Sequence, residues 1–212
     1  GIPSLVLMER AALKTADEIT ERLKDKDRER ILIVCGTGNN GGDGLAVTRL
    51  LQQRGFRVWY YILGNEEKTT AETACQFKNV QYYQVPRANN LDLNEYTTIV
   101  DAIFGVGLSR PVEGKYGEVI SELNQASAYK VAVDIPSGID ADTGFEKGVA
   151  FRADLTVTFA FRKRGLCFYP GRMYGGEIIV ADIGIYSIPG ERVRMHCLEQ
   201  KDLEMLPERI PY

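Results

Sequence analysis

With 212 residues, 44% of them hydrophobic and 26% charged, the sequence has the size and composition of one ordinary globular domain with a full core. Lys and Arg total 26 against 29 Asp and Glu, a net charge of −3, and no basic run or stripe is present, so we expect no nucleic-acid binding. No apolar run is long enough to span a membrane and no signal peptide is visible, so we also expect no membrane association.

The cysteines and the histidine exclude further classes of site. Cys35, Cys75, Cys167 and Cys197 are scattered without CxxC spacing, which argues against a disulfide or a zinc site. Cys35 and Cys167 lie in apolar contexts, which predicts buried, reduced thiols and a cytoplasmic location. The sole histidine, His196, lies in a polar stretch near the C-terminus and is predicted to be a surface residue rather than a catalyst.

The first half of the chain predicts alternating helices and strands. A first helix begins after an N-cap at Ser4, and its apolar face comprises Met8, Ala12, Ala16, Ile19 and Leu23. A strand follows over 30–35, and the next helix places Ala46, Val47, Leu50 and Leu51 inward. The pattern then predicts a strand over 56–64, a helix over 67–78 and a short strand over 80–85.

The second half continues the alternation with a strand that runs into a loop over 96–105, a helix over 117–126, a strand that ends in another loop over 130–138, and strands over 153–161 and 176–185. Several of these strands are continuous apolar runs, and helices separate many of them. This pattern is typical of a mostly parallel sheet covered on both faces. We therefore predict one α/β domain over residues 1–212, a three-layer αβα sandwich of the doubly wound type.

Polar, glycine-rich segments follow three of the predicted strands: GTGNNGGDG from Gly36, DAIFGVGLSRPVEGKYG from Asp101 and DIPSGIDADTG from Asp134. In open parallel sheets, ligands bind beyond the carboxyl ends of the strands. The three loops are therefore expected to converge on one edge of the sheet and to form the functional site there.

The first of these loops fits the dinucleotide pattern GxGxxG at Gly36, Gly38 and Gly41, but this pattern alone is weak evidence. Polar residues interrupt it, and no Lys-Ser/Thr pair follows, which excludes a nucleoside-triphosphate loop. Its N–H groups at a helix N-terminus suit a phosphate. Asp43, expected in the first helical turn, serves either the ligand or the helix dipole.

An NAD-dependent oxidoreductase is one alternative for this pattern. Glu66 and Glu67 follow the second strand and could contact a ribose. They lie about thirty residues after Gly36, whereas the expected offset is about 20 residues, which weakens that alternative.

The other two loops supply carboxylates at strand ends. Asp101 follows an apolar run, where burial is costly unless the carboxylate has a partner. Asp134 also ends an apolar strand and is a candidate acid/base. Ser137 has no histidine nearby, which argues against a hydrolytic triad. The hard oxygens of Asn40, Asp101 and Ser137 suit a monovalent cation better than zinc.

In this order, the segments resemble the NAD(P)H-hydrate epimerase family, also called the YjeF N-terminal domain. The resemblance starts at GIPSLVLMERAA and continues through GTGNNGGDGLAVTRLL, DAIFGVGL, VAVDIPSGIDADTG and ADLTVTFAFRKRGL to GGEIIVADIGI. It implies a Rossmann-like fold and epimerisation of the (R) and (S) forms of hydrated NADH and NADPH, called NADHX and NADPHX. It also implies a homodimer and an ADP- or ATP-dependent NAD(P)H-hydrate dehydratase as partner, fused or separate.

The resemblance assigns site residues position by position. Substrate binding falls on Asn39, Asn40, Gly41, Gly42, Asp43, Gly105, Val106, Gly107, Leu108, Ser109, Arg110, Pro111, Tyr116 and Asp134. Asp134 is also the implied catalytic residue, and one potassium ion per subunit would be held by Asn40, Asp101 and Ser137.

The sequence departs from the family pattern in two places. It lacks the additional helix that usually precedes GIPS, and FAFRKRG stands where the family often has a proline around a lysine, which Lys163 matches. Residues 199–212 resemble the linker to a downstream dehydratase domain. The alternative function is a non-catalytic dimerisation and binding module of the same fold, as in mRNA-decapping scaffolds, although such a module has no need of Asn40, Asp101 and Asp134 together.

Overall fold

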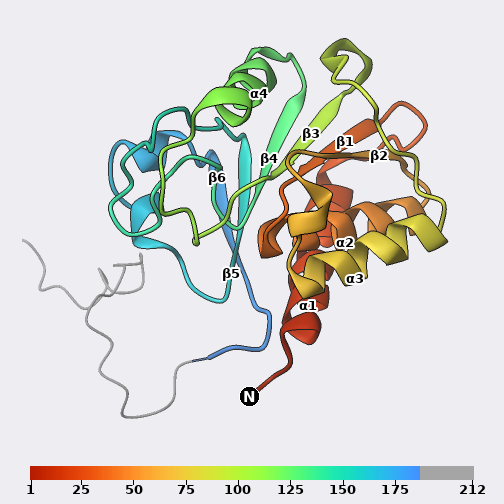
Figure 1. The fold of residues 1–212 in the computed structure, drawn as a ribbon, viewed down its shortest axis with the longest axis horizontal. Helices are drawn as coiled ribbons and strands as arrows, with labels where there is room; N and C mark the ends of the chain where they lie inside the picture. The colour runs from red at the N-terminus through yellow and green to blue at the C-terminus, as the bar shows by residue number, and fades with distance from the viewer. Residues whose placement is uncertain (187–212) are drawn as a thin grey trace, which may run out of the picture.

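The computed structural model describes residues 1–186, and its centre is a six-stranded, all-parallel sheet. The strands lie in the order β2-β1-β3-β4-β5-β6 (Figure 1). Their bounds are Arg30–Cys35 for β1, Arg57–Ile62 for β2, Thr98–Ala102 for β3, Tyr129–Val133 for β4, Leu155–Phe159 for β5 and Glu177–Ala181 for β6. The central strands are buried on both faces, which explains their continuous apolar sequence. The predicted α/β fold is confirmed.

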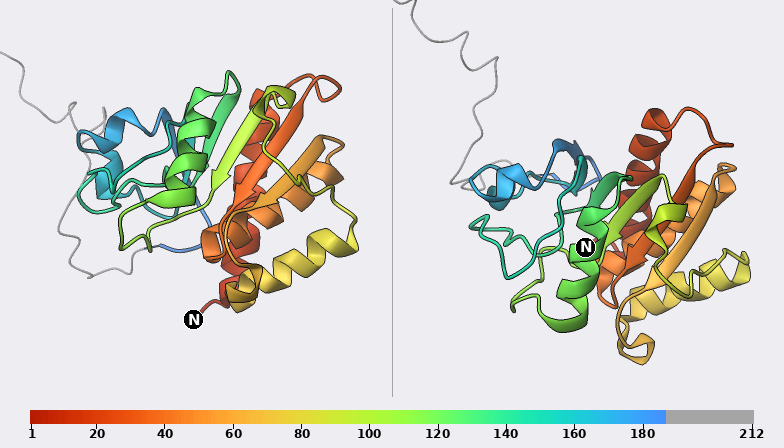
Figure 2. Two further views of the ribbon diagram at one scale, coloured as in Figure 1. Left: turned by 45° about the horizontal axis from the view of Figure 1, so that its top comes forward. Right: turned by 90° about the horizontal axis from the view of Figure 1, so that it is seen from above.

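Helices cover both faces of the sheet. Within residues 1–186, the α-helices are α1 (Ser4–Arg22), α2 (Asn39–Gln53), α3 (Ala71–Tyr82) and α4 (Gly114–Gln125). Short 3-10 turns lie at Glu66–Lys68, Leu93–Glu95, Arg164–Leu166 and Gly171–Met173. Helices α1 and α4 lie on opposite sides of the sheet, and α3 packs beside α2 (Figure 2).

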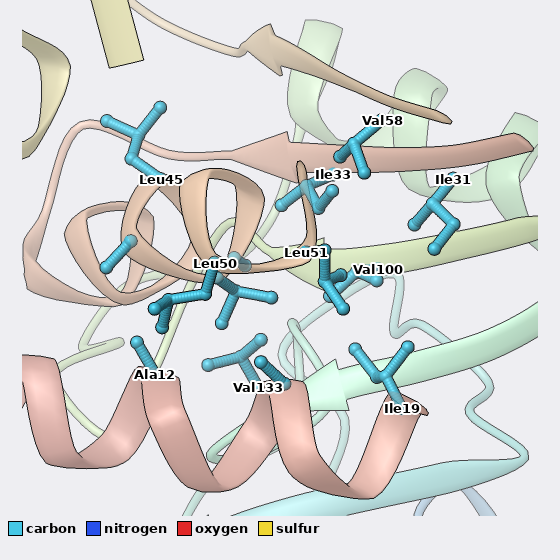
Figure 3. Packing of buried hydrophobic residues seen from close by; sticks show 14 of the residues in the cluster. Ala12, Ile19, Ile31, Ile33, Leu45, Leu50, Leu51, Val58, Val100 and Val133 are labelled. Carbon is cyan, nitrogen blue, oxygen red and sulfur yellow. The ribbon is translucent and has the colours of Figure 1, made fainter. Parts of the chain in front are cut away.

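Among the described residues, an apolar core lies on each face of the sheet, and a smaller third cluster comprises Ile135, Ile139, Ala150, Leu166 and Tyr174. One core joins α1 and α2 to one face of the sheet, where Ala12 and Ile19 face Leu50, Leu51 and Val133 (Figure 3). The other core packs α4 against the opposite face. Each fully buried Leu or Ile contributes about 1.5–3 kcal/mol of transfer free energy, so these cores hold the strand ends in place.

The strand order creates a switch point beside β1. Because β2 lies on one side of β1 and β3 on the other, the connections leaving β1 and β3 diverge, and a crevice opens between them at the carboxyl ends of the strands. Ligands of open α/β sheets bind in such crevices. Among residues 1–186, no helix combines the length and the apolar content needed to cross a membrane.

Several local predictions were wrong. Ser4 is the first residue of α1 rather than its cap, since Pro3 precedes the helix and no side chain caps it. The strand predicted over 80–85 is the last turn of α3 followed by a turn, because Val80 lies on the same buried helical face as Thr73 and Gln76. Cys167 is exposed, whereas Cys35 is buried as predicted.

Two helices begin earlier than predicted, and some predictions cannot be compared with the structure. Helix α4 begins at Gly114 instead of Gly117, and α2 begins at Asn39, so that Asp43 lies beyond its first turn. His196, Cys197 and the predicted linker over 199–212 lie outside the described residues.

Candidate active site

A cavity of about 560 Å³ occupies the switch point. The loops after β1 and β3 form most of its wall, and Asp134 at the end of β4 completes it. Among the residues assigned from the sequence, those that line it are Asn39, Asn40, Asp43, Gly105, Val106, Gly107, Leu108, Ser109, Arg110, Tyr116 and Asp134. Gly41 and Gly42 are buried behind this wall, and Pro111 lines a smaller neighbouring pocket with Arg110 and Tyr116.

The cavity has further lining residues that sequence reasoning did not single out, namely Thr37, Gly38, Thr70, Ile103 and Phe104. The ring of Phe104 lies 5.1 Å from that of Tyr116, centroid to centroid, and gives one side of the cavity an aromatic surface. Thr70 is the N-cap of α3, so only the tertiary fold brings it to this site. Phe104 and Ile103 lie inside the second loop motif and could have been inferred from it.

The glycines of the first loop serve packing between backbone segments. A Cβ atom on Gly36 would lie 2.1 Å from the carbonyl oxygen of Ile103, and one on Gly41 would lie 1.8 Å from that of Gly36. By contrast, a Cβ atom on Gly38 would meet nothing within 4 Å. The dinucleotide-like pattern is therefore explained in part by close backbone contacts, between the first two loops at Gly36 and within the first loop at Gly41, which require glycine at these positions.

Asp101 and Ser137 tie the second and third loops together behind the cavity, and both are fully buried. Asp101 Oδ1 accepts hydrogen bonds from Ser137 Oγ at 2.6 Å and from the Ile103 N–H at 3.1 Å, while Oδ2 accepts one from the Ser137 N–H at 2.7 Å. Burial raises the pKa of the Asp101 carboxyl to about 6, and these hydrogen bonds oppose the rise. The network holds the loops in register.

Asn40 lies beside this network, at the start of α2. It is buried, and a Cβ atom on Gly105 would lie 3.3 Å from its Cγ atom. Its Nδ2 atom has no hydrogen-bond partner within residues 1–186. A buried amide without partners is costly, so this position favours a polar or ionic ligand.

Asp134 has an unusual backbone conformation at the end of β4. Its φ angle is +67°, and the Ile135 N–H donates to the carbonyl of Val133 at 2.9 Å, which closes a three-residue γ-turn around it. Positive φ costs a non-glycine residue of order 1–3 kcal/mol, and such strain is concentrated at functional sites. The Asp134 N–H donates to the carbonyl of Val157 at 2.8 Å and fixes the turn against β5.

One carboxylate oxygen of Asp134 is fully occupied by the protein. Oδ1 lies 2.6 Å from Lys163 Nζ and accepts from the Phe159 N–H at 3.2 Å and from Thr158 Oγ1 at 3.3 Å. The side chains of Asp134 and Lys163 are only 11% and 16% exposed, so their charges are poorly screened. In the part of the chain that the structure describes, no donor reaches Oδ2, and Asp134 itself lines the cavity.

Lys163 is positioned by the segment after β5. Ala160 has a φ angle of +61°, and the Phe161 N–H donates to the carbonyl of Phe159 at 2.7 Å, which forms a second γ-turn beside that of Asp134. Lys163 Nζ also donates to the Phe159 carbonyl at 2.8 Å. Two adjacent strand ends therefore turn sharply and bring a carboxylate and an ammonium group together.

The site combines one paired carboxylate, a helix N-terminus, oxygen-rich side chains and an aromatic wall. Asp134 can accept or return a proton on a bound group, and the N–H groups at the start of α2 can face a phosphate. Within residues 1–186, no group of three or more His, Cys, Asp or Glu could hold a metal ion. The arrangement favours proton transfer on an anionic nucleotide-like molecule.

Comparisons with known proteins agree with this description. Residues 4–165 match the family described as YjeF-related protein N-terminus. The chain is 51% identical over 190 residues to the NAD(P)H-hydrate epimerase of Levilactobacillus brevis, covering 88% of this chain and 86% of that one. It is 48% identical over 194 residues to the enzyme of the same name from Limosilactobacillus reuteri, covering 89% of each chain.

The fold is shared with a solved structure as well. The crystal structure of yeast ynu0 matches with a TM-score of 0.71 and 23% sequence identity, covering 82% of this chain and 77% of that chain. The sequence match, the motifs and the fold together show that the chain belongs to the family of YjeF-related protein N-terminal domains.

Proposed function

We propose that this chain is an NAD(P)H-hydrate epimerase, an isomerase that interconverts the (R) and (S) forms of NADHX and NADPHX. Relatives at about 50% identity carry that name. The observation that carries the proposal is Asp134, which is held in a strained turn at the cavity. One of its carboxylate oxygens is paired to Lys163, and the other has no donor within residues 1–186. This polar constellation weighs against the binding-module alternative.

The chemistry of the substrate fits such a site. The carbon that carries the hydroxyl group in the hydrate is bonded to the ring nitrogen, so it is a hemiaminal centre. It inverts if the C–N bond opens to an aldehyde and recloses, or if water leaves and returns. Both routes move a proton on and off oxygen, and Asp134 is the proposed acid/base for that transfer.

The start of α2 is the proposed place for the pyrophosphate. Gly38 precedes the helix, and it lines the cavity together with Asn39 and Asn40. Unpaired N–H groups and the positive end of the helix dipole favour an anion there. The nicotinamide end of the substrate would then lie toward Asp134, which lines the same cavity.

Potassium is proposed as the bound cation, held by Asn40, Asp101 and Ser137. The residues fit this ion, because the buried carboxylate of Asp101 has no cationic side chain paired with it among the described residues. Ser137 Oγ donates to Asp101 and accepts from the Phe104 N–H at 2.8 Å, which leaves one lone pair free. The amide of Asn40 can present its oxygen by rotation. When bound, the ion would supply a modest positive charge near the substrate oxygens.

A partner enzyme, a cellular location and an oligomeric state are also proposed for the protein. A dehydratase that consumes one epimer, fused or separate, is the proposed partner in repair. A cytoplasmic location is also proposed, which the buried thiol of Cys35 supports. A homodimer is supported by the exposed apolar residues Ile2, Leu5, Val6 and Leu13 on and before α1. Light scattering on the purified protein measures the oligomeric state.

Incubation of purified (R)-NADPHX with the protein tests the proposed function. Chromatography should show the (S) form appearing at a rate that is proportional to enzyme concentration and well above the spontaneous rate. A mixture that changes no faster than the enzyme-free control, together with absence of NADPHX binding by titration, would favour the non-catalytic module.

A further inference from the structure

We propose that Asp43 is the second catalytic residue of the epimerase and donates a proton to the ring nitrogen while Asp134 takes one from the hydroxyl group. This inference rests on the proposed function and assigns a separate step within it. Asp43 of α2 lines the same cavity as Asp134 at the end of β4, so a bound substrate can meet both carboxyl groups.

Asp43 has no structural task that explains it. Helix α2 begins at Asn39 and has no acidic residue in its first turn, so Asp43 lies beyond the positions where a carboxylate caps a helix or best interacts with its dipole. Within residues 1–186, no hydrogen-bond donor reaches its side chain, and no salt bridge includes it. A costly, partly buried carboxyl group without partners favours a role toward the ligand.

The electrostatic surroundings of the carboxyl groups of Asp43 and Asp134 differ. Burial raises the pKa of Asp43 well above its ordinary value, the charge of Asp134 raises it further, and Lys163 opposes the shift. Lys163 forms its 2.6 Å ion pair with Asp134 and not with Asp43. The ammonium group of Lys163 therefore lies against the carboxylate of Asp134, whereas no ion pair among the described residues includes Asp43, and the raised pKa of Asp43 favours its protonated form. Two carboxyl groups in such different surroundings can act as one base and one acid.

Ring opening uses both groups, and its atoms and electrons balance. Asp134 takes the hydroxyl proton, the carbon–oxygen bond becomes a carbonyl, and the carbon–nitrogen bond breaks with its electron pair going to the ring nitrogen. Asp43 gives its proton to that nitrogen. After rotation about the adjacent carbon–carbon bond, the ionised Asp43 takes the proton back from the ring nitrogen as this nitrogen attacks the carbonyl carbon, and the protonated Asp134 returns its proton to the oxygen. The ring closes as the other epimer with no net change in composition.

The test is steady-state epimerisation of (R)-NADPHX by Asp43→Asn, which keeps the size of the side chain and removes the proton donor. We expect kcat to fall by about 100-fold or more and KM to change by less than about threefold, since general acid catalysis contributes about 10²- to 10⁴-fold. Asp142→Asn is the matched control, because Asp142 is exposed and lies outside the cavity, and its kcat should equal that of the wild type.

Formate rescue of Asp43→Ala tests the role of Asp43 if Asp43→Asn is poorly folded, and a double variant tests whether Asp43 and Asp134 act together. The rate of Asp43→Ala should rise at least about tenfold with added formate, a small carboxylic acid that can occupy the vacated space. The kcat of the double variant Asp43→Asn/Asp134→Asn should be at most about threefold lower than that of the slower single variant, because both groups act in one step.

The inference is overturned if Asp43→Asn keeps a kcat within about threefold of the wild type while KM rises, since that pattern means binding alone. A folded Asp43→Ala that formate does not rescue would also overturn it. If the wild-type protein itself fails to epimerise NADPHX, the proposed function fails instead, so the two failures are distinguishable.

Discussion

Asp134 combines three properties that no other described residue shares: a positive φ angle, a buried ion pair and a place on the cavity wall. Its strain is sustained by hydrogen bonds from its own N–H and from that of Ile135. Because the γ-turn fixes the carboxylate relative to β5, Asp134 is oriented before any ligand binds. Such preorganisation is what proton transfer requires.

Lys163 should support catalysis through Asp134. Lys163→Gln removes the ammonium group whose nitrogen lies 2.6 Å from Asp134 Oδ1. The carboxylate of Asp134 is then less well oriented, and its negative charge is less well balanced. We expect kcat to fall by about 10- to 100-fold with a smaller change in KM, measured by steady-state epimerisation. The matched control is Arg162→Gln, which removes an exposed cation one residue away and should leave kcat unchanged. An active Lys163→Gln variant with wild-type kcat would exclude this role.

Sequence reasoning found Asp134 but did not derive its partner. A carboxylate at the end of an apolar strand is visible as a local pattern. The pairing with Lys163 depends on the register of β4 and β5, in which Val133 aligns with Val157, and on the second γ-turn at Ala160. Neither feature has a local signature. Only the resemblance to the family pointed to Lys163, without indicating what it contacts.

Among the elements, the strands were predicted best. β1, β3, β4 and β5 are buried apolar runs, and this pattern survives in any parallel sheet covered on both faces. The prediction of a strand over 80–85 was wrong. The valines and tyrosines of this segment favour a strand, yet Val80 packs into the core as part of α3, so tertiary packing overrides local propensity.

Close packing within the first loop predicts a sharp difference between two neighbouring glycines. Gly41→Ala places a methyl group within 1.8 Å of the Gly36 carbonyl oxygen, whereas Gly38→Ala places one in open space. Gly41→Ala should lower the free energy of unfolding by about 2–4 kcal/mol, and Gly38→Ala should change it by less than about 0.5 kcal/mol. Urea denaturation measures both. Equal stabilities would show that the glycine pattern is not a packing requirement.

Asp140 anchors the segment that joins β4 to β5. It accepts from the N–H groups of Asp142 and Thr143 and from Thr143 Oγ1, and it lies 2.9 Å from Lys147 Nζ. Lys147, followed by these hydrogen bonds, holds the pKa of Asp140 well below its ordinary value. Since the folded state favours the ionised form, the stabilisation is complete above about pH 4 and is lost as the pH falls further.

Asp140→Asn should therefore lower the free energy of unfolding by about 1 kcal/mol at pH 7, after allowance for solvent screening. The difference in the free energy of unfolding between Asp140→Asn and the wild type should narrow below about pH 4. Thermal unfolding at several pH values between 7 and 3 measures this change. Asp142→Asn, which removes an exposed carboxylate from the same segment, serves as the control. A stability difference that stays constant with pH would contradict this account of Asp140.

The strand order decides where the loops meet. The sequence predicted three loops on one edge of the sheet, and the structure places the cavity at the divergence of β1 and β3, with β4 adjacent. Asn40 and Asp134 reach the cavity, while Asp101 and Ser137 are buried behind it. That division could not be predicted, because it depends on how closely the loops pack and not on which strand each loop follows.

Potassium binding should stabilise the fold if the proposed cation site is correct. In KCl, the wild-type protein should unfold about 2–5 °C higher than in LiCl of equal ionic strength, because a ligand held only by the folded state raises Tm. Ser137→Ala removes one proposed ligand and should abolish most of that difference, whatever its own effect on stability. Identical Tm values in both salts for the wild type would exclude a specific potassium site.

The most direct test of the account compares the wild type with Asp134→Asn in the interconversion of (R)- and (S)-NADPHX, followed by chromatography. The substitution keeps the size of the side chain but removes the base that the cavity presents. We expect the rate to fall by at least about 100-fold while the protein stays folded and still binds NADPHX. Interconversion by Asp134→Asn at the wild-type rate would contradict the assignment of the site.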